Sequence, residues 1–139
     1  MAEEFGSITR DERRTLSVLA FLLFRMGMED RARRIYDAIA ELSAPGSADY
    51  RFARAGLAAV AVEAGDGATA LAALRDAMQG GPLSTRDAAL WLIKAQALWQ
   101  QNRREEAAAA RDEFLYLTGR EREAEGPAAA GMTPKESDR

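Results

Sequence analysis

The sequence predicts an all-α protein of three stacked helical hairpins, and two observations lead to this fold class. Alanine is abundant while valine and isoleucine are sparse, and the apolar residues recur at spacings of three and four, as on one face of a helix. Turn residues also divide the chain at nearly equal intervals, because Gly27 to Gly65 is 65 − 27 = 38 residues and Gly65 to Asn102 is 102 − 65 = 37. We expect one α-solenoid domain over residues 9–119, a flexible N-terminus over residues 1–8 and a polar, mobile tail over residues 120–139.

The first hairpin begins at a capping box. Thr9 and Glu12 have the spacing at which each side chain can bond the backbone N–H of the other. The first helix should start there and run to about Met26, and Gly27 can adopt the left-handed conformation that ends a helix. A second helix should cover about residues 29–42, before the run Ser43-Ala44-Pro45-Gly46 breaks it.

The second and third hairpins follow from similar start and stop signals. Pro82 ends the fourth helix because its ring cannot continue one, and Ser84 or Thr85 can cap the fifth. Gly119 is expected to end the sixth helix. We therefore expect the last four helices at about residues 48–63, 68–79, 84–101 and 103–118.

Alanines occupy equivalent positions in the three hairpins. They lie seven residues before each turn residue and five after it, at Ala20, Ala58 and Ala95 and at Ala32, Ala70 and Ala107. Two helices approach closely only where side chains are short, so these positions should be contact points. Bulky residues also correspond, namely Leu16, Leu19, Leu23, Leu57, Trp91 and Leu98 on the first helices and Tyr36, Leu74 and Phe114 on the second. The register favours a repeat over an alanine-rich bundle with accidental spacing, which remains the alternative.

This pattern resembles the tetratricopeptide repeat, a helix-turn-helix unit of 34 residues. Trp91, Tyr36 and Pro82 each match a position of that repeat. Arg54 departs from it where an aromatic residue is expected, and Arg111 departs where a bulky residue is expected. The loops between hairpins are also longer than the repeat implies.

The resemblance implies a concave surface, lined by the first helix of each hairpin, that holds a peptide segment. That surface should be mainly apolar and lacks the charged set that clamps a C-terminal carboxylate in some repeats. An apolar or amphipathic partner segment fits it better. The alternative is that Phe21, Phe24 and Trp99 are core residues between hairpins. The residues that we expect to bind a partner are Phe21, Phe24, Arg25, Phe52, Ala55, Ala59, Val62, Leu92, Gln96 and Trp99.

Composition argues against several other functions. The chain has no cysteine and no histidine, so we expect no thiol or imidazole chemistry, no metal site, no cofactor and no enzymatic activity. The net charge of -3 argues against nucleic-acid binding, and the arginine-rich stretch Arg10–Arg34 is interleaved with acids, as on a solvated face. The longest apolar run, Leu16–Phe24, is too short to span a bilayer and is expected to be a core helix segment. The acidic N-terminus lacks a signal-peptide pattern, so a cytoplasmic location is expected.

Two stretches resemble the small tetratricopeptide chaperones of bacterial type III secretion, most closely the YscY type. One is Thr15–Leu42, with its apolar run, glycine turn and Asp30-Arg31-Ala32-Arg33-Arg34-Ile35-Tyr36, and the other is Leu90–Leu117, with Trp91-Leu92-Ile93-Lys94-Ala95-Gln96-Ala97-Leu98. The resemblance implies a protein that binds a small exported partner of the YscX type and helps present it to the export gate. The translocator-chaperone class is a close rival, since Asp49-Tyr50-Arg51-Phe52 is similar to its second repeat, although its long N-terminal helical extension is missing.

The leading hypothesis is therefore a cytoplasmic bacterial chaperone of an exported protein, with possible self-association when the chain is alone. A general scaffold that joins components of another assembly is the alternative from a different class. An enzyme that uses carboxylates alone is a third hypothesis, which the absence of any phosphate loop or nucleophile motif disfavours.

Overall fold

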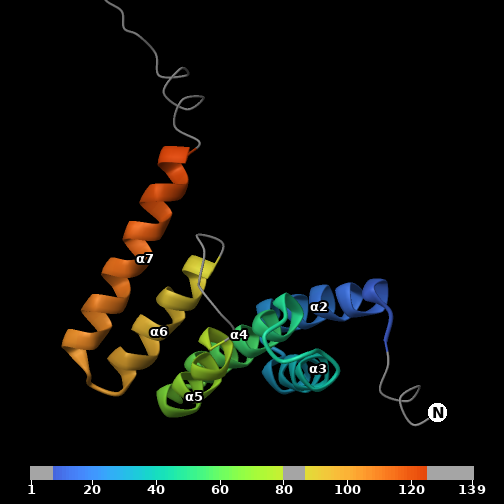
Figure 1. The fold of residues 1–139 in the computed structure, drawn as a ribbon. Helices are drawn as coiled ribbons and strands as arrows, with labels where there is room; N and C mark the ends of the chain where they lie inside the picture. Colours follow the sequence, from blue (N-terminus) through green and yellow to red (C-terminus); the bar gives the residue numbers. More distant parts are fainter. Residues whose placement is uncertain (1–7, 80–86, 125–139) are drawn as a thin grey trace, which may run out of the picture.

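The computed structural model describes residues 8–79 and 87–124, with side chains described as far as residue 119. Within this part of the chain every regular element is a helix, which confirms the all-α class (Figure 1). The helices are α2 (Arg10–Arg25), α3 (Glu29–Glu41), α4 (Ala48–Glu63), α5 (Gly67–Met78), α6 (Ala88–Gln100) and α7 (Arg104–Ala124). Residues 1–7, 80–86 and 125–139 lie outside the described residues, and with them the predicted roles of Pro82, Ser84 and Thr85.

The helices form three hairpins that follow one another as in an α-solenoid. The pairs α2–α3, α4–α5 and α6–α7 are each in contact, and α3 and α5 also contact the first helix of the next hairpin. The first helices touch one another, since α4 contacts both α2 and α6, whereas α3 and α5 make no such contact in the described part of the chain. The row of first helices is therefore the inner, concave side of the curve.

The turns are built by the residues that the sequence indicated. Thr9 and Glu12 form the expected capping box, in which the Glu12 N–H donates to Thr9 Oγ1 at 3.0 Å and the Thr9 N–H donates to Glu12 Oε1 at 2.8 Å. Gly27, Gly65 and Asn102 all have positive φ, at 80°, 79° and 60°. These left-handed residues end helices α2, α4 and α6 and reverse the chain, so the predicted 38- and 37-residue spacing marks equivalent turns.

One helix boundary differs from the prediction. Helix α7 does not end at Gly119 but continues to Ala124, so residues 120–124 are helical and do not belong to a tail. A single glycine costs a helix only about 1 kcal/mol relative to alanine, and the following Arg-Glu-Arg-Glu run has good helix propensity, so the helix continues through it.

The alanine register is confirmed as the centre of the packing. All six aligned alanines, Ala20, Ala32, Ala58, Ala70, Ala95 and Ala107, are buried. Larger residues fill the spaces between the helices, and Ile39, Leu74 and Leu98 are the largest fully buried side chains. The short alanine side chains let the helices of each hairpin approach, and the larger residues then seal the junctions.

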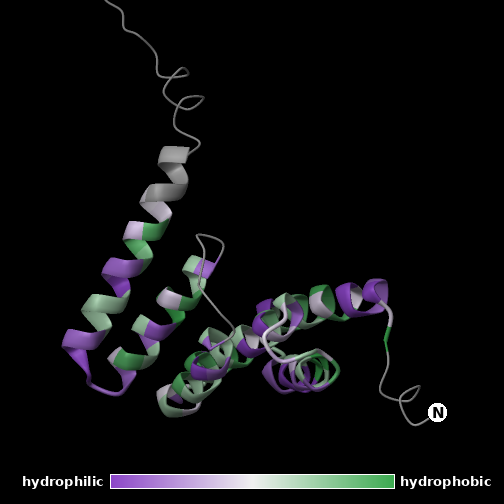
Figure 2. Ribbon diagram, in the orientation of Figure 1, coloured by the Kyte–Doolittle hydropathy of each residue, from purple (hydrophilic) through white to green (hydrophobic). Residues whose placement is uncertain are grey.

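The expectation that Leu16–Phe24 is a core segment is wrong for much of the run. Ala20 is buried, but Val18, Leu19, Phe21 and Leu22 are 42–55% exposed. Among the described helices α2 packs on α3 and α4 only, and none of them covers its opposite face. Figure 2 shows α2 as hydrophobic beyond its charged first turn. Leu19 is therefore not the internal packing residue that its position in the repeat suggested.

Glycines allow two close contacts between hairpins. Gly56, inside α4, lies against the ring of Tyr36 from α3, and a Cβ at this position would overlap that ring. Gly67, the first residue of α5, lies equally close to the carbonyl of Ala97 in α6. These contacts need a residue with no side chain, which explains two glycines that are not at left-handed turns.

Two arginines form equivalent clamps between consecutive hairpins. Arg13 of α2 donates to the carbonyl of Leu42 beyond α3 at 3.3 Å and pairs with Asp49 of α4 at 3.5 Å. Arg51 of α4 donates to the carbonyl of Ala77 in α5 at 3.1 Å and pairs with Asp87 before α6 at 3.4 Å. The repeat relates the two sets of residues, since 51 − 13 = 38 and 87 − 49 = 38. Each clamp bonds an end carbonyl of a second helix and ties it to the start of the next hairpin.

Candidate protein-binding groove

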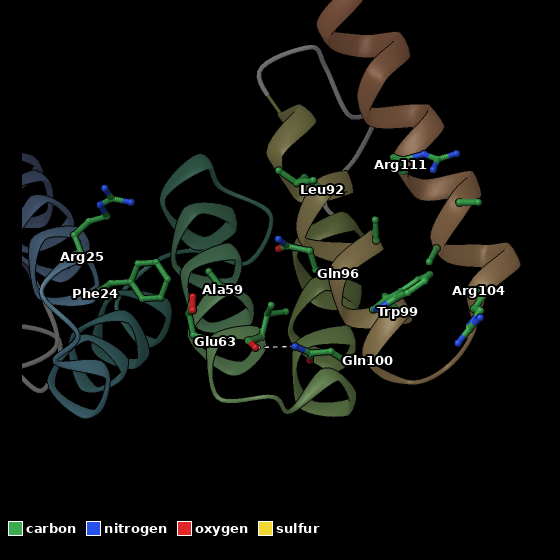
Figure 3. Close-up of a pocket in the computed structure, with 14 residues that line it drawn as sticks. Phe24, Arg25, Ala59, Glu63, Leu92, Gln96, Trp99, Gln100, Arg104 and Arg111 are labelled. Atoms are coloured by element: carbon green, nitrogen blue, oxygen red, sulfur yellow. Dashed lines mark hydrogen bonds between the residues drawn. The ribbon is translucent and has the colours of Figure 1, made fainter.

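A groove of about 880 Å³ crosses the concave side at the end where the hairpins turn (Figure 3). It is lined by Phe24 and Arg25 of α2, by Ala59, Val62 and Glu63 of α4, by Leu92, Ala95, Gln96, Trp99 and Gln100 of α6, and by Arg104, Ala107, Ala108 and Arg111 of α7. All three first helices therefore contribute to it, together with the last helix.

A second hollow of about 530 Å³ continues the first, because Phe24 and Ala59 line both. Its walls are largely aromatic and aliphatic and include Phe21, Phe52 and Leu90. The ring of Phe52 lies 5.8 Å from that of Tyr36, which anchors this wall in the core. We call the two hollows together the concave groove.

All ten predicted binding residues line the concave groove. Phe21, Phe52, Ala55 and the shared residues Phe24 and Ala59 line the smaller hollow, and the remaining five line the larger one. The first helices bring them together because residues three, four and seven apart share one face of a helix. The structure therefore assembles this set from three helices that are separated in sequence.

The exposure of the aromatic residues distinguishes between the two predictions made for them, that they bind a partner or that they are core residues between hairpins. Trp99 is 61% exposed, Phe21 50%, Phe52 42% and Leu92 38%, so these side chains are not enclosed between hairpins. Phe24 is half-buried, packs against the cluster around Ala20 and Tyr36, and still forms part of the groove wall. Exposed apolar side chains gathered along one groove are typical of a surface that another molecule covers.

Helix α7 adds residues that the sequence reasoning did not place in the groove. Arg104 holds its guanidinium over the ring of Trp99, 5.1 Å from the ring centroid, and Ala108 and Arg111 follow on the same helix face. In the repeat pattern this helix belongs to the outer layer, yet four of its residues line the larger hollow. The one sequence feature that could have indicated this contribution of α7 was Arg111, where a charge replaces the bulky residue of the repeat.

The arginine at the other unusual position, Arg54, has a structural explanation. It takes the place of an aromatic residue and reaches across the hairpin to Asp76 of α5 at 2.9 Å, so an ion pair stands where the repeat usually has a ring. Arg54 lies outside the concave groove.

The groove has a charged edge and a polar crosslink. Among the lining residues of the larger hollow, the three cations Arg25, Arg104 and Arg111 are accompanied by a single acid, Glu63. Gln100 donates to the carbonyl of Val62 at 2.8 Å, which joins the end of α6 to that of α4 and holds the floor of the groove together. The groove is thus apolar in its middle and basic at its sides.

No described helix is long and apolar enough to cross a membrane. Within residues 8–79 and 87–119, no three acidic side chains gather closely enough to hold a metal ion. No family model matches this chain, and no curated protein matches it either.

Proposed function

We propose that the protein binds another polypeptide, holding an apolar or amphipathic segment of it in the concave groove without catalysing a reaction. The observation that carries this proposal is the exposure of Phe21, Phe52, Leu92 and Trp99 in one groove of an acidic, all-helical chain. Uncovered, such a groove would favour self-association, and a partner segment that covers it would stabilise both chains.

The more specific proposal is a chaperone of bacterial type III secretion that acts in the cytoplasm. It rests on the resemblance of Thr15–Leu42 and Leu90–Leu117 to YscY-type chaperones. In this proposal the partner is a small exported protein of the YscX type, which the pair presents to the export gate. A hydrophobic translocator subunit as the client, and a general interaction scaffold, are the alternatives.

Co-expression with small secretion proteins encoded beside this gene tests the proposal. We expect one of them to co-purify at a fixed stoichiometry and to raise the melting temperature of the chain, because ligand binding to the folded state stabilises it. Trp99→Asp together with Leu92→Asp should abolish the complex by placing charges in the apolar groove.

The matched control is Ala109→Asp, which adds a charge at an exposed position of α7 that does not line the groove. This variant should retain the complex. If the doubly substituted chain binds as well as the wild type, the groove is not the binding site. If the chain is monodisperse alone and gains no stability from any such neighbour, the secretion assignment fails.

A further inference from the structure

The charges at the sides of the concave groove restrict what it can bind. The chain as a whole has a net charge of -3, yet the larger hollow is lined by three arginines and one glutamate. Arg25 lies on the α2 side and Arg104 and Arg111 lie on α7, so the cations flank the apolar floor (Figure 3). The lining of the larger hollow is therefore basic in a chain that is acidic as a whole.

These arginines are available to an incoming carboxylate. In the described part of the chain, Arg25 and Arg104 have no carboxylate within salt-bridge distance, and Arg104 lies over Trp99 instead. Arg111 pairs only with its exposed neighbour Asp112 at 3.2 Å. Such an exposed pair is worth little, about 0–1 kcal/mol, so Arg111 can exchange it for another acid at small cost.

The groove also favours a helix over an extended strand. Its walls are helices, whose backbone groups are bonded internally, so they offer an extended guest no row of free N–H and C=O groups to pair with. Gln100 is already engaged with Val62. A helix satisfies the hydrogen bonds of its own backbone. Acids seven residues apart on it are separated by about 10.5 Å along its axis, as Arg104 and Arg111 are on α7.

We infer that the concave groove takes an amphipathic helix of the partner whose apolar face is flanked by acidic residues. This inference rests on the proposed function and adds the chemistry of the partner segment. The apolar face covers Leu92 and Trp99, and carboxylates along its two edges pair with Arg25 on one side and with Arg104 and Arg111 on the other.

A display library tests the inference without knowledge of the natural partner. The library encodes 21-residue amphipathic helices with a constant apolar face and with Glu, Lys or Gln at equal frequency at each flanking position. It is selected on the full wild-type chain, on the groove-blocked Leu92→Asp/Trp99→Asp chain, and on a chain with Arg25, Arg104 and Arg111 all changed to Gln. A matched chain with Arg31, Arg34 and Arg75 changed to Gln has the same net charge but leaves the groove intact.

We expect Glu to be enriched at the flanks on the wild-type and matched chains and not on the chain with the three groove arginines removed. By fluorescence anisotropy, an enriched peptide should bind the wild type about tenfold more tightly than its Lys-flanked version, and high salt should reduce this ratio.

Each other outcome overturns a defined part of the argument. Binders without acidic bias, or with a bias that survives removal of the groove arginines, overturn the inference and leave the proposed function standing. No enrichment over the groove-blocked chain overturns the inference of a helical occupant, and the co-expression experiment then decides the proposed function separately. A wild-type chain that dimerises through Trp99, and that no Glu-flanked peptide converts to monomer, would show that a second copy is the preferred occupant of the groove, which also overturns the inference.

Discussion

Replacement of Arg51 by methionine should weaken the junction between the second and third hairpins. The methionine retains the apolar stem of the arginine but loses the bond to the Ala77 carbonyl and the pair with Asp87. Both charged side chains are largely buried, at 18% and 17% exposed, so water replaces the lost contacts poorly. A hydrogen bond to a charged group contributes about 1.5–3 kcal/mol, and we expect the free energy of unfolding to fall by about 2 kcal/mol.

The matched control is Arg54→Met, in the same helix one turn away. Arg54 pairs with Asp76, whose side chain is 46% exposed, and its Nε is a buried donor without a partner. Removing an exposed pair costs about 0–1 kcal/mol, and removing the unpaired donor offsets part of that cost. Urea denaturation followed by circular dichroism measures both variants.

Hydrogen exchange should place the effect in the structure. Because Arg51 ties α5 to the start of α6, the Arg51→Met change should increase amide exchange in α6 and α7 more than in α2 and α3. The clamp argument is refuted if Arg51→Met unfolds within about 0.5 kcal/mol of the wild type, the usual range for a surface substitution, or if Arg54→Met costs as much.

Three further predictions test the packing. Gly56→Ala should destabilise the protein by about 1–3 kcal/mol because its Cβ meets the ring of Tyr36, whereas the Cβ of Gly119→Ala meets nothing and should stabilise the protein by up to about 1 kcal/mol. Thermal unfolding measures both variants, and a change in stability of the same sign for both would contradict the contact. Leu98→Ala, at a 2% exposed position, should lower the free energy of unfolding by about 2–5 kcal/mol, and Leu22→Ala, at a 50% exposed position, should lower it by well under half of that. If urea denaturation gives similar losses for the two variants, the face of α2 that carries Leu22 is covered. Burial raises the pKa of Tyr36 above its ordinary value of 10.0, so the phenol ionises first in the unfolded state and the stability should fall as the pH rises past 10. Tyr36→Phe should remove that part of the alkaline loss of stability, and a pH profile of stability identical to that of the wild type would exclude the effect.

The arrangement of helices and turns was largely predictable because it depends on local preferences. The capping box at Thr9, the left-handed turns at Gly27, Gly65 and Asn102, and the spacing of the alanines each involve residues close in sequence. The arginine clamps also carried a sequence signal, since Arg13 and Arg51 lie 14 residues before their turn glycines, 27 − 13 = 14 and 65 − 51 = 14. Charged residues at helix starts are so common that this signal had no meaning without the partners.

The positions of the groove residues followed from the repeat, but their exposure did not. Phe21, Phe24 and Trp99 have similar sequence surroundings, yet Phe21 and Trp99 are exposed and Phe24 is half-buried. Burial depends on which helix lies opposite each face, and an apolar residue has the same helical spacing whether it faces a core or a groove.

The sequence by itself determined the helical class, the three turns and the face of each first helix that carries the apolar residues, because backbone preference and periodicity act over a few residues. Only the tertiary structure decided that no described helix covers Val18 and Leu22 of α2, that Gly56 accommodates Tyr36, and that α7 brings Arg104 and Arg111 to the groove. The physical reason is that these features depend on which helices lie opposite one another in space, and no short stretch of sequence contains both sides of such a contact.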